Sequence, residues 1–185
     1  ALLDAMQKVC PITPNQDGAE TLAYVYSHYF LGRRATALAR IDLLNKISQN
    51  FDVTVYTHAD CKDILPTAIY GGKIDYYDTM PTVFQHSKIN LNITLKTIQT
   101  GIPLRAWDIL GCGGFLLTNF QQELCDFFIP GEDFVYYESP ADAIEKAAYF
   151  LSHDRERQEI AHNAFEKIAA SHTFHHRVQS MFDII

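Results

Sequence analysis

Residues 88–119 read KINLNITLKTIQTGIPLRAWDILGCGGFLLTN, and the order of the patterns within them decides the fold. Residues 88–93 predict a β-strand, and residues 114–118 predict a second, fully apolar strand. Between them, Pro103 opens a predicted short helix over 104–111, because proline is favoured where a helix starts. A strand, a helix and another strand in this order form the unit from which parallel sheets are built.

The same alternation continues on both sides of this stretch. Strands are predicted over 51–56, over 73–77 after a Gly71-Gly72 turn, and over 133–137. Helices are predicted over most of the first fifty residues, with a turn at 11–18, and over 121–128, 154–171 and 174–182. Two further helices are predicted to begin after capping residues: one at Met80 after Asp78-Thr79, and one at Pro140 after Ser139. Five strands alternating with helices predict an α/β fold, with a mainly parallel sheet of about five strands and helices on both faces.

The composition fits one well-buried domain. The 185 residues are 48% hydrophobic and 20% charged, which excludes a disordered chain. The 15 Lys and Arg against 22 Asp and Glu give a net charge of −7, which disfavours nucleic acid and anionic membranes as partners. A small anionic ligand is compatible with this charge, because one or two arginines and backbone N–H groups can hold it locally.

Cysteine usage and hydropathy indicate a cytoplasmic protein without a transmembrane segment. The four cysteines lie far apart and form no C-x-x-C pair, which argues against a zinc cage and a disulfide framework and fits reduced thiols. No apolar run approaches the roughly 18 residues that a bilayer requires. The first residues show neither a methionine nor a signal sequence, so we expect the chain to be a piece of a longer protein.

A ligand is expected at the carboxyl ends of the parallel strands, where open α/β sheets bind theirs. Near these predicted ends lie His58, Tyr77–Met80, Asn92–Lys96, Thr118-Asn119 and Tyr137-Glu138. The loop after the 88–93 strand contains Gly101, which frees the backbone to approach a ligand, and it leads into a helix N-terminus with unpaired N–H groups.

Arg105 and Asp108 lie on one face of the predicted 104–111 helix. An arginine at the helix start suits a phosphate, and a carboxylate one turn deeper suits sugar hydroxyls. An ion pair with a purely structural role explains the same spacing equally well. Gly111–Gly114 is not a dinucleotide fingerprint, because it follows a helix and precedes a strand, and we expect a helix C-cap and a tight turn there.

Aromatic and histidine residues offer weaker candidates. Tyr76, Tyr77, Tyr136 and Tyr137 could stack on a base, although aromatic strand residues more often belong to the core. Three histidines near the C-terminus are expected on a solvated helix face and not in a metal site: His172, His175 and His176. His58 and His86 stand alone near predicted loops.

The stretch 88–119 resembles the C-terminal domain of the CgeB-like (spore-maturation-type) glycosyltransferases, close to the group 1 glycosyltransferases. Three further segments look like motifs of that family: Met80–Phe84, Pro130-Gly131 with Val135–Tyr137, and 157–173. The resemblance covers about residues 33–182. It implies the C-terminal, donor-binding half of a GT-B enzyme, with a Rossmann-like domain over 33–185 that binds a nucleotide-diphosphate sugar. Residues 1–32 would be a helical remnant of a linker or of the missing N-terminal acceptor domain.

The resemblance also implies roles for single residues. In related retaining enzymes a helix carries an E-x7-E pair, whose first acid contacts the donor sugar and whose second acid contacts the ribose of the nucleotide. Asp108 matches the second acid. The first falls on Thr100, which is not acidic. Arg105 matches the arginine before that acid and is the candidate catalytic residue, stabilising the leaving diphosphate. The expected substrate-binding residues are Thr100, Gly101, Arg105, Asp108, Tyr77, Met80, His58 and Asn119. Such enzymes generally act without a bound metal, and we expect no cofactor.

Transfer also requires an acceptor, which the sequence does not identify and whose binding domain would precede residue 1. We therefore expect this chain to bind nucleotide weakly and without turnover. One alternative is a non-catalytic GT-B-like binding or assembly domain, favoured by Thr100 in place of an acid. A receiver domain is a weaker alternative, because the 88–93 strand ends in Asn92-Ile-Thr where a receiver needs an Asp. An NAD-dependent oxidoreductase is weaker still, for want of the glycine fingerprint.

Overall fold

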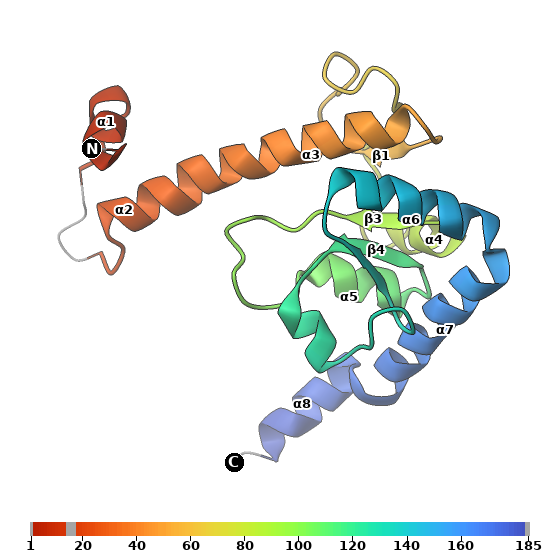
Figure 1. The fold of residues 1–185 in the computed structure, drawn as a ribbon. Coiled ribbons are helices and arrows are strands. Elements are labelled where there is room, and N and C mark those ends of the chain that lie inside the picture. Colours follow the sequence, from red (N-terminus) through yellow and green to blue (C-terminus); the bar gives the residue numbers. More distant parts are fainter. Residues whose placement is uncertain (1, 14–17, 184–185) are drawn as a thin grey trace.

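The computed structural model describes residues 2–13 and 18–183. Its elements alternate between helices and short strands along most of the chain (Figure 1). The helices are α1 (Leu2–Val9), α2 (Leu22–Val25), the π-helix η1 (Tyr26–Gly32), α3 (Arg33–Ser48), α4 (Met80–His86), α5 (Leu104–Gly111), the 3₁₀ helix η2 (Gln122–Asp126), α6 (Pro140–Ser152), α7 (Asp154–Ser171) and α8 (Phe174–Phe182). The strands are β1 (Thr54–Tyr56), β2 (Ile69–Gly72), β3 (Asn90–Asn92), β4 (Leu116–Asn119) and β5 (Val135–Tyr137).

The fold is mixed α/β with parallel strands, as predicted, but the expected single sheet of about five strands is wrong. β3, β4 and β5 form one parallel sheet, and β1 and β2 form a separate parallel pair. Among the described residues, β1 and β3 share no ladder hydrogen bonds, and a cleft of about 1320 Å³ lies between them. Alternation of side chains predicts that a segment is a strand but does not name its partner, which tertiary packing selects.

The second strand lies earlier than predicted. It spans Ile69–Gly72 in place of 73–77, so the two glycines expected in a turn belong to the strand. Hydrogen bonds to the β1 segment fix it there: Ile69 N donates to Val53 O at 2.8 Å, and Thr57 N donates to Gly72 O at 2.9 Å. A Cβ on Gly71 would lie 2.6 Å from the Tyr56 ring, so a glycine lets that ring lie across the strand.

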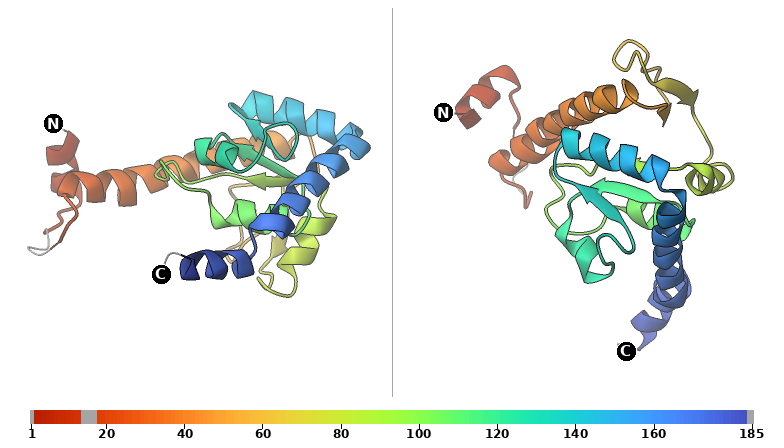
Figure 2. Two further views of the ribbon diagram at one scale, coloured as in Figure 1. Left: turned by 90° about the horizontal axis from the view of Figure 1, so that it is seen from below. Right: turned by 45° about the vertical axis from the view of Figure 1, so that its right-hand side comes forward.

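The three-stranded sheet is buried on both faces, which confirms the predicted helices on either side of it. Leu117 packs with Ala147 of α6 and Ile47 of α3, whereas its neighbour Leu116 packs with Ile109 of α5. Figures 1 and 2 show α6 and α5 on opposite sides of β4. Burial of one such leucine side chain contributes about 1.5–3 kcal/mol, so these two layers hold the fold together.

Local signals give most helix boundaries correctly. The Ser139 hydroxyl accepts a hydrogen bond from Asp142 N, with Pro140 in the first turn of α6. The bounds of α5, α7 and α8 match the predicted ones. The predicted helix over 121–128 is present only as the shorter 3₁₀ helix η2, because i+3 hydrogen bonds such as Leu124 N to Gln121 O close its turns.

The N-terminal part is a long helical arm. α2, η1 and α3 follow one another directly and extend beyond the sheet, with α1 at the far end (Figure 1). The Tyr26 hydroxyl donates to Gln7 Oε1 at 2.7 Å and lies 2.5 Å from Cys10 O, which attaches α1 to the arm. The predicted turn at 11–18 falls partly on residues 14–17, outside the described residues, and the domain boundary at 32/33 stays a prediction. None of the helices described is both long and apolar enough to cross a membrane.

Candidate functional site

A buried polar network closes the carboxyl edge of the three-stranded sheet. Asn92 Nδ2 donates to Thr94 Oγ1 at 3.1 Å and to Thr118 Oγ1 at 2.9 Å. Asn119 Oδ1 accepts a hydrogen bond from Thr94 N at 2.8 Å. Because buried polar groups need such partners, this network fixes where the chain leaves β3. Asn119 therefore anchors the following loop, and its predicted contact with substrate stays a prediction.

Helix α3 and η1 support the loop over 93–103. The Arg40 guanidinium donates to Ile93 O, at 2.6 Å from Nη2. Lys96 N donates to Thr36 Oγ1 at 3.0 Å. The predicted site residues Thr100 and Gly101 are exposed beyond these anchors, and Gly101 has a φ of +94°, a conformation that glycine adopts readily.

Arg105 and Asp108 meet residues of the turn before α4. The Tyr76 hydroxyl donates to Asp108 Oδ1 at 2.9 Å, and Arg105 Nη1 lies 4.0 Å from Asp108 Oδ2. The Arg105 guanidinium also contacts Met80 Sδ and lies 5.3 Å from the centre of the Phe84 ring and 5.9 Å from that of Tyr76. We call these five residues the Arg105 cluster. It joins the turn before α4 and α4 itself to α5, and its contacts link residues 21 to 32 positions apart in the sequence.

The Arg105 cluster keeps one cation partly open to solvent. The Arg105 side chain is 42% exposed and that of Asp108 is 20% exposed. The ion pair that the sequence left open as an alternative is present, but a pair this exposed contributes at most about 1 kcal/mol. The hydrogen bond to Asp108 raises the pKa of Tyr76, with burial adding to the effect, so the phenol keeps its proton. The cluster can therefore offer a guanidinium to an anion, beside a carboxylate that also accepts hydroxyl groups.

Comparison of the sequence with models of known protein families identifies a family for this chain. A family model described as glycosyl transferase-like matches residues 33–183. The chain belongs to this glycosyl transferase-like family. No curated protein matches the chain. The family supports sugar transfer in general, and the narrower CgeB-like resemblance stays a prediction.

The turn that supplies Tyr76 to the glycosyl transferase-like domain is built around Asp75. Its Oδ1 accepts hydrogen bonds from Tyr77 N and Asp78 N, both at 2.8 Å, which lowers the pKa of Asp75. The Tyr77 ring lies 5.0 Å from that of Tyr76 and its side chain is exposed. Tyr77 and Met80, both predicted, therefore lie beside Arg105 and Asp108. From the sequence alone, Tyr76 is only a weaker candidate for stacking on a base and Phe84 is not among the site candidates, although an Asx turn beside a tyrosine pair is a usable signal.

Other predicted residues of the glycosyl transferase-like domain lie apart from the Arg105 cluster. His58 follows β1 in the separate two-stranded sheet. Within the described ranges, no hydrogen bond or ion pair joins His58, Thr100 or Gly101 to Arg105. Their contact with a ligand stays a prediction.

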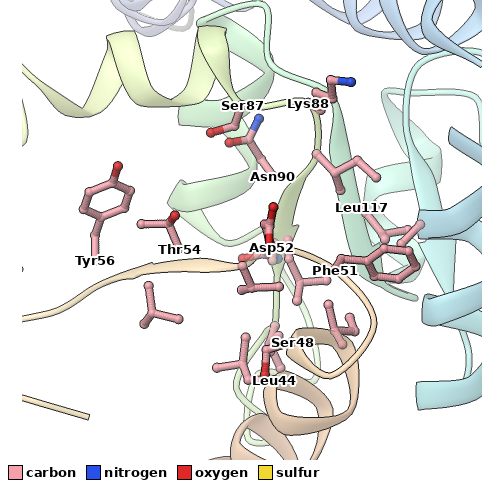
Figure 3. Close-up of a pocket in the computed structure, with 18 of the residues that line it drawn as sticks. Leu44, Ser48, Phe51, Asp52, Thr54, Tyr56, Ser87, Lys88, Asn90 and Leu117 are labelled. Carbon is pink, nitrogen blue, oxygen red and sulfur yellow. The ribbon is translucent and has the colours of Figure 1, made fainter. Parts of the chain in front are cut away.

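The Arg105 cluster lies on the wall of the cleft between β1 and β3. Arg105, Met80 and Phe84 line this cleft of about 1320 Å³. Figure 3 shows Asp52, Thr54 and Tyr56 on its β1 wall and Ser87 and Asn90 on the opposite one. Ligand pockets usually measure about 300–1,000 Å³. This cleft is larger and mixes polar with apolar side chains, so it has room for a ligand beside Arg105.

Histidines and cysteines form no apparent metal centre in the part of the chain that the structure describes, where no group of three or more His, Cys, Asp or Glu could hold an ion. The expected solvated helix face is wrong for His172, which packs against Trp107, Phe127 and Phe128. Its Nδ1 lies 2.7 Å from Arg177 Nη2. The histidine thus attaches α8 to the body of the domain.

Proposed function

We propose that this domain binds the donor of a glycosyltransferase, a nucleotide-diphosphate sugar whose sugar is transferred to an unknown acceptor. The observation that carries the proposal is Arg105, a partly exposed guanidinium in the first turn of α5 that faces the cleft. Donors at a helix N-terminus together with an arginine suit a diphosphate, because both favour negative charge. The domain would be the C-terminal half of a GT-B, CgeB-like enzyme.

We propose that the residues of the Arg105 cluster and the neighbouring Tyr77 contact different parts of the donor. Arg105 and the α5 N-terminus would neutralise the charge that develops on the leaving diphosphate, without a metal. Asp108, whose position Tyr76 fixes, would accept hydrogen bonds from the ribose hydroxyls. Tyr77, whose side chain is 83% exposed on the turn before α4, would stack on the base.

Transfer requires donor and acceptor to be held in line. We propose that the Arg105 cluster would contact the donor and that the acceptor binds outside residues 33–183, which the family match covers. This chain would then bind nucleotide without turnover.

The test is a thermal-shift and calorimetric screen of this chain with UDP, GDP, ADP and CMP, with and without Mg²⁺. We expect one diphosphate to stabilise the chain independently of Mg²⁺, by about 2.7 kcal/mol at one hundred times Kd. Arg105→Ala should weaken that binding about tenfold or more, because a charge-assisted contact is lost. Arg155→Ala, on the exposed face of α7, is the matched control and should bind like the parent. Equal binding by Arg105→Ala and the parent would exclude the site.

A non-catalytic binding or assembly domain is the second candidate, favoured by Thr100 where related retaining enzymes have an acid. Thr100 is exposed on the loop after β3. Turnover of nucleotide sugars by the full-length protein separates the two: release of a nucleoside diphosphate supports the enzyme, and tight binding without release supports the second candidate.

A further inference from the structure

A second cavity lies at the opposite edge of the three-stranded sheet. Its volume is about 290 Å³, and it is formed by the end of α4, the start of β3, the turn before β4 and the first half of α7. Because these segments lead into the strands, the cavity lies at the amino ends of β3 and β4. The loop and first turn of α5 that carry the proposed donor site lie at the carboxyl ends. The cavity shares no residue with the Arg105 cluster, although Ser87 and Lys88 also line the large cleft between β1 and β3.

The lining of this cavity is basic, although the whole chain has a net charge of −7. Lys88 and Arg157 supply two cations, His86 and His162 two imidazoles, and no Asp or Glu is among the described residues that line it. Gln85, Ser87 and Gln158 add polar groups. A concave surface with this lining favours an anion.

Arg157 is a buried cation with unused donors. Its side chain is 8% exposed, and Nη1 donates to Phe150 O and to Asp154 Oδ1, both at 2.6 Å. In the described part of the chain, Nε and Nη2 donate to no acceptor. A guanidinium carries five N–H donors in a planar fork, so at least three remain for a ligand.

The charge of Arg157 is only partly balanced. Asp154 is exposed, and its pKa is lowered first by the hydrogen bond from Arg157 and also by the positive charge of Lys88. Two cations thus face one carboxylate. In Figure 3 the Lys88 amine extends away from the β1 wall of the large cleft, which Lys88 also lines.

His86 contributes one ring nitrogen to the cavity lining, and the hydrogen bond of its other nitrogen shows which one that is. Its Nδ1 lies 2.8 Å from Thr82 O, and because a carbonyl oxygen only accepts, Nδ1 carries the proton. Nε2 is therefore the nitrogen left for a ligand, and it can accept from a protonated phosphate or donate once the ring is charged.

We propose that this cavity binds a phosphate-sized anion, either inorganic phosphate or the phosphomonoester group of a larger molecule. Arg157 and Lys88 would supply the charge-assisted hydrogen bonds, and Gln158 and the histidines the remaining polar contacts. The inference does not rest on nucleotide binding, because none of these residues belongs to the Arg105 cluster.

The test is a titration of the ¹⁵N-labelled chain with sodium phosphate at constant ionic strength, followed by amide chemical shifts. We expect saturable shifts confined to residues 85–88, 113–115 and 157–162. Lys88→Gln should weaken binding about tenfold, the usual size of a lost charge-assisted contact. Gln158→Glu, on an exposed position of α7, places a carboxylate in the cavity and should abolish binding. Lys73→Gln is the matched control, since Lys73 is exposed and outside the lining.

The outcomes separate this inference from the donor site. Shifts that do not saturate, or that are the same in Lys88→Gln and Gln158→Glu as in the parent, overturn it. Shifts that disappear in Arg105→Ala would assign the phosphate to the donor site and also overturn it, while leaving the proposed function intact. Methyl phosphate distinguishes the two sources, because equal binding indicates a phosphomonoester group and weaker binding indicates free phosphate; both support the cavity.

Discussion

Tyr76 donates a hydrogen bond from its hydroxyl to Oδ1 of Asp108, 2.9 Å away and 32 residues later in the sequence. This bond links the turn before α4 to the middle of α5 and sets the carboxylate beside Arg105. The hydrogen bond to Asp108, and after it burial, raises the pKa of Tyr76, so the bond can be measured from the tyrosine.

Asp108→Asn should lower the pKa of Tyr76 toward its usual value, because the carboxylate that favours the protonated phenol is gone. Tyrosine Cζ chemical shifts measured against pH report this directly. Tyr24, on the helical arm, is the internal reference and should titrate as in the parent. An unchanged Tyr76 titration would show that the bond does not form in solution.

Gly32→Ala should displace the loop over 93–103. A Cβ there would lie 2.1 Å from Thr97 Cγ2, a separation at which one of the two segments must move. We expect a loss of about 1–3 kcal/mol in the free energy of unfolding, measured with urea. Thr97→Ser removes the Cγ2 and should restore part of that loss in the double variant. No recovery would mean that the alanine acts elsewhere.

Lys167→Met should destabilise the domain, because Asp133 is buried and its Oδ2 contacts the Lys167 amine. The lost pairing leaves a buried charge, and we expect about 2 kcal/mol, less than a fully buried pair loses, since Lys167 is 39% exposed. In the double variant with Asp133→Asn the loss should be smaller. A larger loss in the double variant would contradict this account and point to the hydrogen bond from Ile129 N.

The stability of the domain should fall as the pH drops below about 6.5, the usual histidine pKa. Burial, and after it Arg177, lowers the pKa of His172 in the folded chain, so the unfolded chain binds the proton more readily. Urea unfolding at about pH 7.5 and about pH 5.5 measures the effect. His172→Phe keeps an aromatic ring against Trp107 and should show a smaller change than the parent or the His175→Phe control.

Local patterns in the sequence give much of the fold. Apolar residues of β4, the proline before α5 and the serine cap of α6 each act within a few residues, so their elements follow directly from the sequence. The predicted contact between Arg105 and Asp108 likewise depends on helical spacing alone.

Contacts between segments that lie far apart in the sequence could not be predicted from these local patterns. The hydroxyl of Tyr76 reaches Asp108 only because α4 and α5 pack together, and His172 is covered only because α8 folds back on Trp107. The division of the strands into a pair and a triplet has the same origin, since it depends on where β1 lies relative to β3.

That division has a thermodynamic consequence. β1 and β2 bond to each other, and most of their side chains are exposed or half-buried, whereas β4 is enclosed by two layers of core. The chain should therefore contain two cooperative units of unequal stability, and residues 54–72, which hold β1 and β2, should open without disturbing β3, β4 and β5. Amide protons of Thr57 and Ile69 would then exchange with solvent long before that of Asn90, and the first protease cut would fall on the β1–β2 side of the cleft.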